Sequence, residues 1–219
     1  MVRPLIGILG GTFDPVHIGH MQLAREAIRS LGLDVLRCIP AGQPPHRNQP
    51  LARAADRLVM AHRVFDGEPR CVVDDAEIRR KGASWTIHTL ERLRAASPDS
   101  ALVLIVGADA LLGLPGWHRW QELLDFAHIA VANRPGSSLQ PSTMPVALAS
   151  LWQRRHTTDV SMLRQSPAGH IVSFTIAPCP VSATGIRQAV SRGEAITGWV
   201  CPAVENYIRD HHLYTHAAC

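Results

Sequence analysis

The residues most suited to chemistry lie between positions 10 and 20, in the run Gly-Gly-Thr-Phe-Asp-Pro-Val-His-Ile-Gly-His. Glycines after an apolar stretch let backbone amides approach a ligand without a Cβ in the way. His17 and His20 are three residues apart, so they share one face of a helix expected to begin near His17. The amides and positive dipole end of that helix would favour an anion. The pattern predicts a phosphate-binding turn, and the alternative is a tight turn with two incidental histidines. The residues predicted to form the phosphate-binding turn are Gly10, Gly11, Thr12, Phe13, His17 and His20.

This turn matches neither GxGxxG nor GxxxxGK[ST], so the usual dinucleotide and P-loop interpretations fail.

A second anion site is predicted near the C-terminus. Ser182 is a good N-cap for a helix over Thr184–Ser191. The hydroxyls of Ser182 and Thr184 and the fork of Arg187 would bind phosphate oxygens there. An ordinary capped surface helix is the alternative.

Three further positions could bind parts of a nucleotide. Asp109 follows a buried apolar run, where a carboxylate can accept ribose hydroxyls or, alternatively, cap the next turn. Trp117 could stack on a flat ring or pack in the core. His46 and Arg47 lie in a loop bracketed by prolines, which suits either a mobile binding loop or a solvated one.

Apolar periodicity predicts elements that alternate between strand and helix. The expected strands are 5–9, 35–39, 71–73, 101–106, 129–132 and 171–176. The expected helices are 18–31, 51–65, 86–95, 117–126, 146–155, 184–191 and 203–211. This order predicts one α/β domain over residues 1–219, a Rossmann-like doubly wound parallel sheet with helices on both faces and C-terminal helices appended. Ligands of such sheets bind at the carboxyl ends of the strands, so Gly10 and Gly107 should face one crevice.

Composition excludes several classes of protein. Hydrophobic residues make up 46% and charged residues 18% of the 219 residues, which is typical of a globular domain. A net charge of +4 without a basic stripe suits an anionic ligand and argues against nucleic acid. No apolar run approaches a membrane span and no signal peptide is visible, so a cytoplasmic protein is expected. The five widely spaced cysteines and scattered histidines predict neither a protein-bound metal nor disulfides.

The motifs together resemble the HxGH nucleotidyltransferase superfamily and, within it, the bacterial nicotinate-mononucleotide adenylyltransferase family. The resemblance rests on six motifs in the family's order along nearly the whole chain. They are the turn at 10–20, Pro44-Pro45-His46-Arg47, Ser84-Trp85-Thr86-Ile87 with Thr89-Leu90, Gly107-Ala108-Asp109 followed by Trp117, Arg134-Pro135-Gly136, and Val181-Ser182-Ala183-Thr184-Gly185-Ile186-Arg187. The ending from Tyr207 to Tyr214 is also similar to the family's C-terminus.

The resemblance implies adenylyl transfer from ATP, with Mg²⁺, to nicotinate mononucleotide, giving deamido-NAD and pyrophosphate in NAD biosynthesis. His17, His20 and Arg187 would then be catalytic, with His20 as the main transition-state contact. Gly107 and Asp109 would contact a ribose, and the Ser182–Arg187 motif the β- and γ-phosphates of ATP. The implied acceptor-binding residues are His46, Arg47, Thr86, Trp117, His118 and Arg134.

Two positions depart from the common family pattern. His88 stands where an Asp is frequent, and Gly185 where a bulkier residue is frequent.

Three alternative functions remain. Pantetheine-phosphate adenylyltransferase usually has a shorter chain with Thr-Asn-Gly-His at this turn; a nucleotide-binding regulator would have lost its catalytic residues; and an RNA-binding relative would carry a basic stripe and a KMSKS-like loop.

Overall fold

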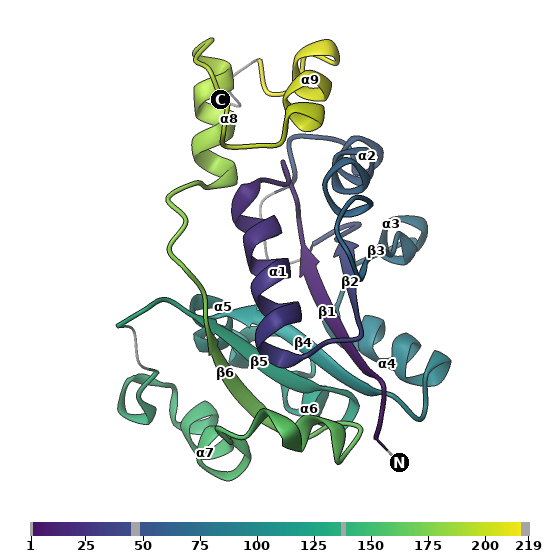
Figure 1. Ribbon diagram of the computed structural model, residues 1–219, viewed down its shortest axis with the longest axis vertical. Helices are drawn as coiled ribbons and strands as arrows, with labels where there is room; N and C mark the ends of the chain where they lie inside the picture. Colours follow the sequence, from purple (N-terminus) through teal and green to yellow (C-terminus); the bar gives the residue numbers. More distant parts are fainter. Residues whose placement is uncertain (1, 45–48, 137–138, 216–219) are drawn as a thin grey trace. The chain divides into compact units, whose positions relative to one another are not determined.

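The computed structural model describes residues 2–44, 49–136 and 139–215, and within them the strands form one six-stranded sheet (Figure 1). The strands are β1 (Leu5–Gly11), β2 (Val35–Pro40), β3 (Cys71–Val73), β4 (Ala101–Gly107), β5 (His128–Asn133) and β6 (Ile171–Thr175). Their order is β3-β2-β1-β4-β5-β6, and the pairings of β1 with β4, β4 with β5 and β5 with β6 are parallel. The strand order reverses between β1 and β4, which confirms the predicted doubly wound α/β fold.

Helices connect the strands as the apolar spacing predicts. They are α1 (Ile18–Leu31), α2 (Ala54–Phe65), α3 (Ala76–Arg79), α4 (Thr86–Ala96), α5 (Ala108–Leu112), α6 (Leu123–Phe126), α7 (Val146–Arg155), α8 (Ala183–Ser191) and α9 (Pro202–Asp210). The bounds of α1 and α7 are those expected from the sequence, and α8 and α9 are the predicted C-terminal helices. The short helices α3 and α5 were not among the predictions.

The helix predicted over residues 117–126 is wrong in its first half. Trp120–Glu122 form a 3₁₀ turn, and only Leu123–Phe126 are α-helical. The residue before the 3₁₀ turn, Arg119, has a φ of 53°, in the left-handed region. A right-handed helix cannot run through that conformation, although the apolar spacing of the segment imitates one.

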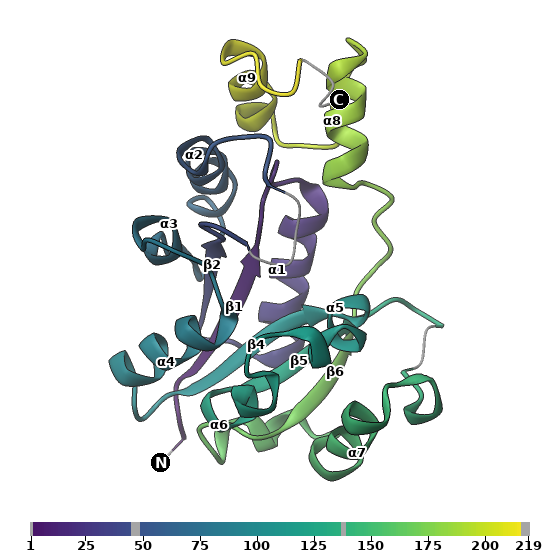
Figure 2. The same cartoon turned by 180° about the vertical axis from the view of Figure 1, so that it is seen from behind.

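The chain forms two compact units. The first unit consists of Met1–Leu9, Arg25–Arg37 and Trp85–Pro178, and the second of Gly10–Ala24, Cys38–Ser84 and Cys179–Cys219. In the first unit α4 and α6 cover one face of the sheet and the carboxyl-terminal half of α1 lies on the other (Figures 1 and 2). In the second unit α2 packs against α9.

Strands β4 and β5 lie in the centre of the first unit's core. All residues of β4 but Gly107 are buried, as are all residues of β5 but Asn133. Strands covered on both faces are apolar along their whole length, which explains the unbroken apolar runs in the sequence. Only their last residues remain accessible, at the carboxyl ends where ligands of such sheets bind.

No helix among the described residues is both long and apolar enough to cross a membrane. The four described cysteines, Cys38, Cys71, Cys179 and Cys201, are free thiols. Cys38 on β2 is fully buried, and a hydrogen bond with Cys71 together with burial raises the pKa of its thiol.

A buried histidine begins β5. His128 has no exposed surface, its Nδ1 accepts the amide of His170 at 3.0 Å, and its Nε2 lies 3.0 Å from the carbonyl of Ser166. Because an amide can only donate and a carbonyl can only accept, the ring is the neutral tautomer with its hydrogen on Nε2. Burial lowers the pKa of His128 to about 4.

His128 should make folding stability sensitive to acid. Between pH 6.5 and about 4 the unfolded chain binds a proton at this ring that the native protein does not. The stabilisation is therefore complete above pH 6.5 and is lost as the pH falls towards 4. We expect this ring to account for a loss of about 2 kcal/mol in unfolding free energy between pH 7 and pH 5. Urea unfolding of His128→Gln should show a smaller loss over that range, whereas the exposed control His62→Gln should follow the wild type. An unchanged loss in His128→Gln would contradict the assignment.

Candidate active site

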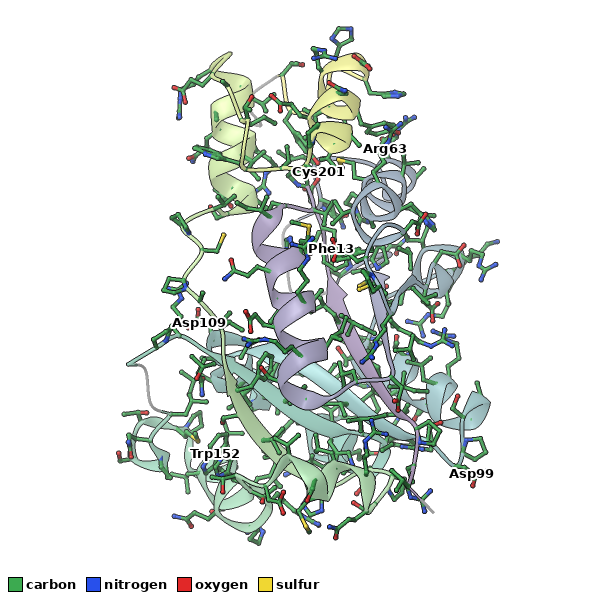
Figure 3. The ribbon with its side chains drawn as sticks, in the orientation of Figure 1. Phe13, Arg63, Asp99, Asp109, Trp152 and Cys201 are labelled. Carbon is green, nitrogen blue, oxygen red and sulfur yellow. The ribbon has the colours of Figure 1, made fainter. Side chains whose placement is uncertain are left out.

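Gly10 and Gly11 end β1 and begin the glycine turn (residues 10–17), and their surroundings differ. A Cβ on Gly11 would lie 2.8 Å from the ring of Phe13, so packing inside the protein requires glycine there. Phe13 is 1% exposed, has a φ of 51° and lies beside the first turn of α1 (Figure 3). A Cβ on Gly10 would meet nothing within 4 Å in the described part of the chain. Of the two glycines, Gly10 is thus the one whose surroundings are open to a ligand.

The two histidines of the turn lie together, as their spacing predicts. Their ring centroids are 3.9 Å apart, and the ring of His20 also makes an edge contact with Phe13 at 5.0 Å. A Cβ on Gly19 would lie 3.0 Å from the His17 ring, so the glycine between the histidines makes room for that ring. The glycine in the His-Ile-Gly-His pattern of residues 17–20 is therefore needed for the packing of the His17 ring.

The hydrogen bonds of the pair define what each ring can offer. The amide of His17 donates to Nδ1 of His20, and the amide of Gly19 donates to Nδ1 of His17, both at 3.2 Å. Each Nδ1 is an acceptor, so the ring hydrogen of each neutral imidazole is on Nε2. Burial lowers the pKa of His17 to about 4, which keeps this ring neutral at physiological pH. Both rings therefore carry their hydrogen on Nε2.

The first amides of α1 already have acceptors inside the protein. Besides those of His17 and Gly19, the amide of Ile18 donates to the carbonyl of Trp199 at 3.0 Å. The sequence predicts that these amides face the phosphate. In the structure these three amides are bonded inside the protein instead.

The second predicted anion site lies in the same unit. Ser182 caps α8 as expected, its hydroxyl accepting the amide of Gly185 at 3.1 Å. Arg187 donates from Nη2 to the hydroxyl of Thr184 at 3.2 Å and from Nη1 to the carbonyl of Asp14 at 2.7 Å. The guanidinium thereby links the start of α8 to the glycine turn, two motifs that the sequence treats separately.

A small cavity opens beside this helix start. Its volume is about 140 Å³ and it is lined by Pro180, Val181, Ser182, Gly185 and Trp199. Trp199 is 37% exposed, although a ring of that size is usually more deeply buried. Sequence reasoning missed Trp199, for which no motif was available. Gly185, which stands where a bulkier residue is frequent, lines this cavity, and a Cβ there would lie 3.3 Å from the Ser182 hydroxyl.

In the first unit, polar residues follow the carboxyl ends of β4 and β5. Gly107 precedes α5, and Asp109 in the first turn of that helix is exposed. Asn133 ends β5 with a buried Oδ1 that has no hydrogen-bond partner among the described residues, and the exposed Arg134 follows. Asn133 was missed because an amide at a strand end forms no recognisable pattern.

An aromatic cluster forms around the start of α4 in the same unit. The rings of Trp85 and His118 are 4.8 Å apart at 37°, and His88 meets His118 at 6.0 Å. Thr86 is the first residue of α4, and Trp117 is half-buried beside His118. Sequence reasoning did not connect Trp85 and His88 with His118, because the contact joins segments about 30 residues apart along the chain.

The carboxylates near this cluster are already paired. Arg119 donates to Glu91 at 2.8 Å and to Glu122 at 2.8 Å. Its hydrogen bonds lower the pKa of Glu122, so that carboxylate remains ionised and satisfied. The predicted residues His46 and Arg47 lie outside the described residues.

Comparisons with known proteins identify the family of the chain. The family described as cytidylyltransferase-like matches residues 8–189. A protein of Dechloromonas aromatica named a probable nicotinate-nucleotide adenylyltransferase is 45% identical over 98% of this chain and 99% of its own. One of the same name from Pseudomonas fluorescens is 47% identical over 95% and 96%.

Solved structures show the same fold at lower sequence identity. The nicotinic acid mononucleotide adenylyltransferase of Plasmodium falciparum, complexed with NaAD, superposes with a TM-score of 0.74 at 13% identity over 97% of this chain and 98% of its own. A putative nicotinate-nucleotide adenylyltransferase from Vibrio parahaemolyticus gives 0.61 at 15% identity, covering 96% and 94%. The chain therefore belongs to the cytidylyltransferase-like family and, within it, to the nicotinate-nucleotide adenylyltransferases.

Proposed function

We propose that this protein transfers the adenylyl group of ATP to nicotinate mononucleotide, releasing pyrophosphate and forming deamido-NAD in NAD biosynthesis. The observation that carries the proposal is the pair of adjacent imidazoles at the glycine turn, with Arg187 bonded to the same turn. In this reaction a phosphate oxygen of the mononucleotide forms a bond to the α-phosphorus of ATP. The bond from that phosphorus to the bridging oxygen breaks, and the electron pair leaves with pyrophosphate.

The attacking oxygen is already ionised at neutral pH, so the reaction needs no strong general base. The protein's contribution is to position the groups and to stabilise charge on the phosphate oxygens as the bonds exchange. His20 would contact the transition state through Nε2–H, while His17 and the backbone of residues 10–13 hold the phosphates. Donors that are neutral and fixed in direction suit this task because they need no proton transfer of their own.

Residues of each unit are proposed to contact the outer phosphates and a ribose. In the second unit, Ser182, Thr184 and Arg187 would bind the β- and γ-phosphates of ATP. In the first unit, the exposed carboxylate of Asp109 beside Gly107 would accept ribose hydroxyls. ATP would bind as its Mg²⁺ complex, because this ion is usually held by substrate phosphates with few protein ligands.

The acceptor is proposed to bind to the first unit's aromatic cluster. Trp117 would stack on the pyridine ring, with Thr86 and His118 as donors to its carboxylate and Arg134 as a further cation. His46 and Arg47 would reach the acceptor's phosphate. This substrate set involves neither nucleic acid nor a membrane and suits a cytoplasmic enzyme.

A pyrophosphate-release assay with MgATP tests the function. The acceptor panel should contain nicotinate mononucleotide, nicotinamide mononucleotide, phosphopantetheine and glycerol phosphate. Release with a pyridine mononucleotide supports the proposal. Release with phosphopantetheine alone would indicate a different adenylyltransferase activity. Release with none of the four acceptors would contradict the proposal and favour the alternative of a nucleotide-binding regulator.

Substitution of Arg187 should separate ATP from AMP. Arg187→Ala removes a charge-assisted contact to the β- and γ-phosphates, which AMP lacks. We expect calorimetry to show ATP binding weakened about fivefold, with AMP binding close to wild type. The exposed control Arg192→Ala, in an ion pair with Glu194 at the end of α8, should affect neither nucleotide. An equal loss for both nucleotides would mean that Arg187 does not contact the outer phosphates.

A further inference from the structure

The carboxylate of Asp14 joins three distant segments of the second unit. Asp14 is 5% exposed, and its Oδ2 accepts the amide of Leu51 at 2.8 Å. Its Oδ1 accepts the amide of Ala52 at 3.0 Å and the hydroxyl of Tyr214 at 2.7 Å. The acid therefore fixes both the segment before α2 and the C-terminal tyrosine to the glycine turn.

The backbone of the same turn is held by two guanidinium groups. Arg57, 1% exposed on α2, donates to the carbonyl of Thr12 at 2.7 Å and to that of Gly42 at 3.1 Å. Arg187 donates to the carbonyl of Asp14 at 2.7 Å. Arg57 also attracts the buried carboxylate of Asp14. Burial lowers the pKa of the Arg57 guanidinium, and the negative charge of Asp14 partly offsets that lowering.

Tyr214 completes the hydrogen bonding of Asp14. The tyrosine is 8% exposed, and burial together with the neighbouring Asp14 carboxylate raises the pKa of its hydroxyl. The hydroxyl therefore stays protonated and acts as a donor. Removing a partner from a buried carboxylate leaves an unsatisfied charge, which favours a change in the position of Asp14.

We propose that Tyr214 is a positioning residue for ATP, acting through Asp14 on Arg187. Arg187 is held at Nη1 by the carbonyl of Asp14 and at Nη2 by Thr184, so the position of Asp14 sets the direction of the guanidinium. A displaced Asp14 carbonyl turns the guanidinium away from its phosphate-binding orientation. The inference rests on the proposed function only in assigning the outer phosphates of ATP to Arg187.

The test compares two conservative substitutions. Tyr214→Phe removes the hydroxyl that reaches Asp14. Tyr207→Phe on α9 is the matched control, because its buried hydroxyl donates to the carboxylate of Asp56 at 3.0 Å and does not reach the turn. We expect Tyr214→Phe to weaken ATP binding about threefold while AMP binding is unchanged. Tyr207→Phe should lower the melting temperature and leave the ratio of ATP to AMP affinity as in the wild type.

A double-mutant cycle with Arg187→Ala completes the experiment. If Tyr214 acts through Arg187, Tyr214→Phe should cause no further ATP-specific loss in the Arg187→Ala background. The same ATP-specific loss in both backgrounds would overturn this route, as would an equal loss of ATP and AMP affinity in Tyr214→Phe. Because binding is measured without an acceptor, these outcomes are independent of the pyrophosphate assay that tests the function.

Asp14→Asn provides a second variant that keeps the backbone carbonyl. An amide cannot accept the two backbone amides and the tyrosine hydroxyl as the carboxylate does. We expect the same selective loss of ATP affinity in this variant. Wild-type affinity for both nucleotides in a folded Asp14→Asn protein would contradict the proposal.

Discussion

Replacing His20 with alanine is expected to lower kcat at least ~100-fold while ATP affinity changes little. Loss of one donor that is oriented towards the transition state typically costs about 10²–10³ in kcat. The ring of His20 is held in one orientation, since its Nδ1 accepts the amide of His17 and its ring makes an edge contact with Phe13. In the wild type, the Nε2–H of His20 would stabilise the charge that develops in the transition state more than it stabilises bound ATP. ATP affinity should therefore change little when this donor is removed.

The measurement is steady-state kinetics of pyrophosphate release, with ATP affinity determined separately by calorimetry. His62→Ala is a suitable control, because His62 lies exposed on α2 and contacts Asp66. A circular dichroism melt of His20→Ala should confirm that the variant folds. Turnover close to that of the wild type would remove His20 from the mechanism.

The second large effect concerns the choice of acceptor. Nicotinate mononucleotide should be preferred over nicotinamide mononucleotide at least ~10-fold in kcat/KM. The two differ only in a carboxylate against a carboxamide, and an amide brings donors that need acceptors. The proposed pocket offers Thr86 and His118 as donors, while the nearby Glu91 and Glu122 are already paired with Arg119. A mispaired polar group in a buried site costs about 1–3 kcal/mol, which corresponds to about tenfold or more.

Parallel kinetics with both mononucleotides at saturating MgATP decide the question. His118→Phe is an informative variant, because it keeps an aromatic ring next to Trp85 and removes the ring nitrogens. It should lower kcat/KM for the nicotinate form more than for the nicotinamide form. Equal kcat/KM values for the wild type, or a preference for the amide, would overturn the nicotinate assignment and leave adenylyl transfer intact.

The fold could be predicted because its signals are local. Apolar residues repeat at helical spacing from Ile18 to Leu31, and the buried strands β4 and β5 appear as unbroken apolar runs. The segment from Trp117 to Phe126 misled the same reasoning, because one left-handed residue, Arg119, interrupts an apolar pattern that looks helical. A single φ angle set by surrounding packing is not visible in side-chain spacing.

The candidate site was predictable only where its residues are close in sequence. The contact between His17 and His20 follows from a three-residue spacing, and the cap at Ser182 from its place before α8. The partners of Asp14 are 37 to 200 residues away, so no local pattern could connect them. For the same reason the aromatic cluster at Trp85 emerged only when the fold brought its segments together.

The bond between Asp14 and Tyr214 also has a consequence for the order of events during translation. The two side chains leave the ribosome 200 residues apart. At elongation rates of about 5–20 residues per second, the glycine turn is synthesised roughly 10–40 s before the tyrosine that completes its hydrogen bonding. The nascent chain therefore carries the whole HxGH motif for most of its synthesis without the contact that finishes the turn. If Tyr214 positions Arg187 as proposed, the last part of the selectivity for ATP over AMP is gained only after Tyr214, which follows α9, has emerged and bonded to Asp14.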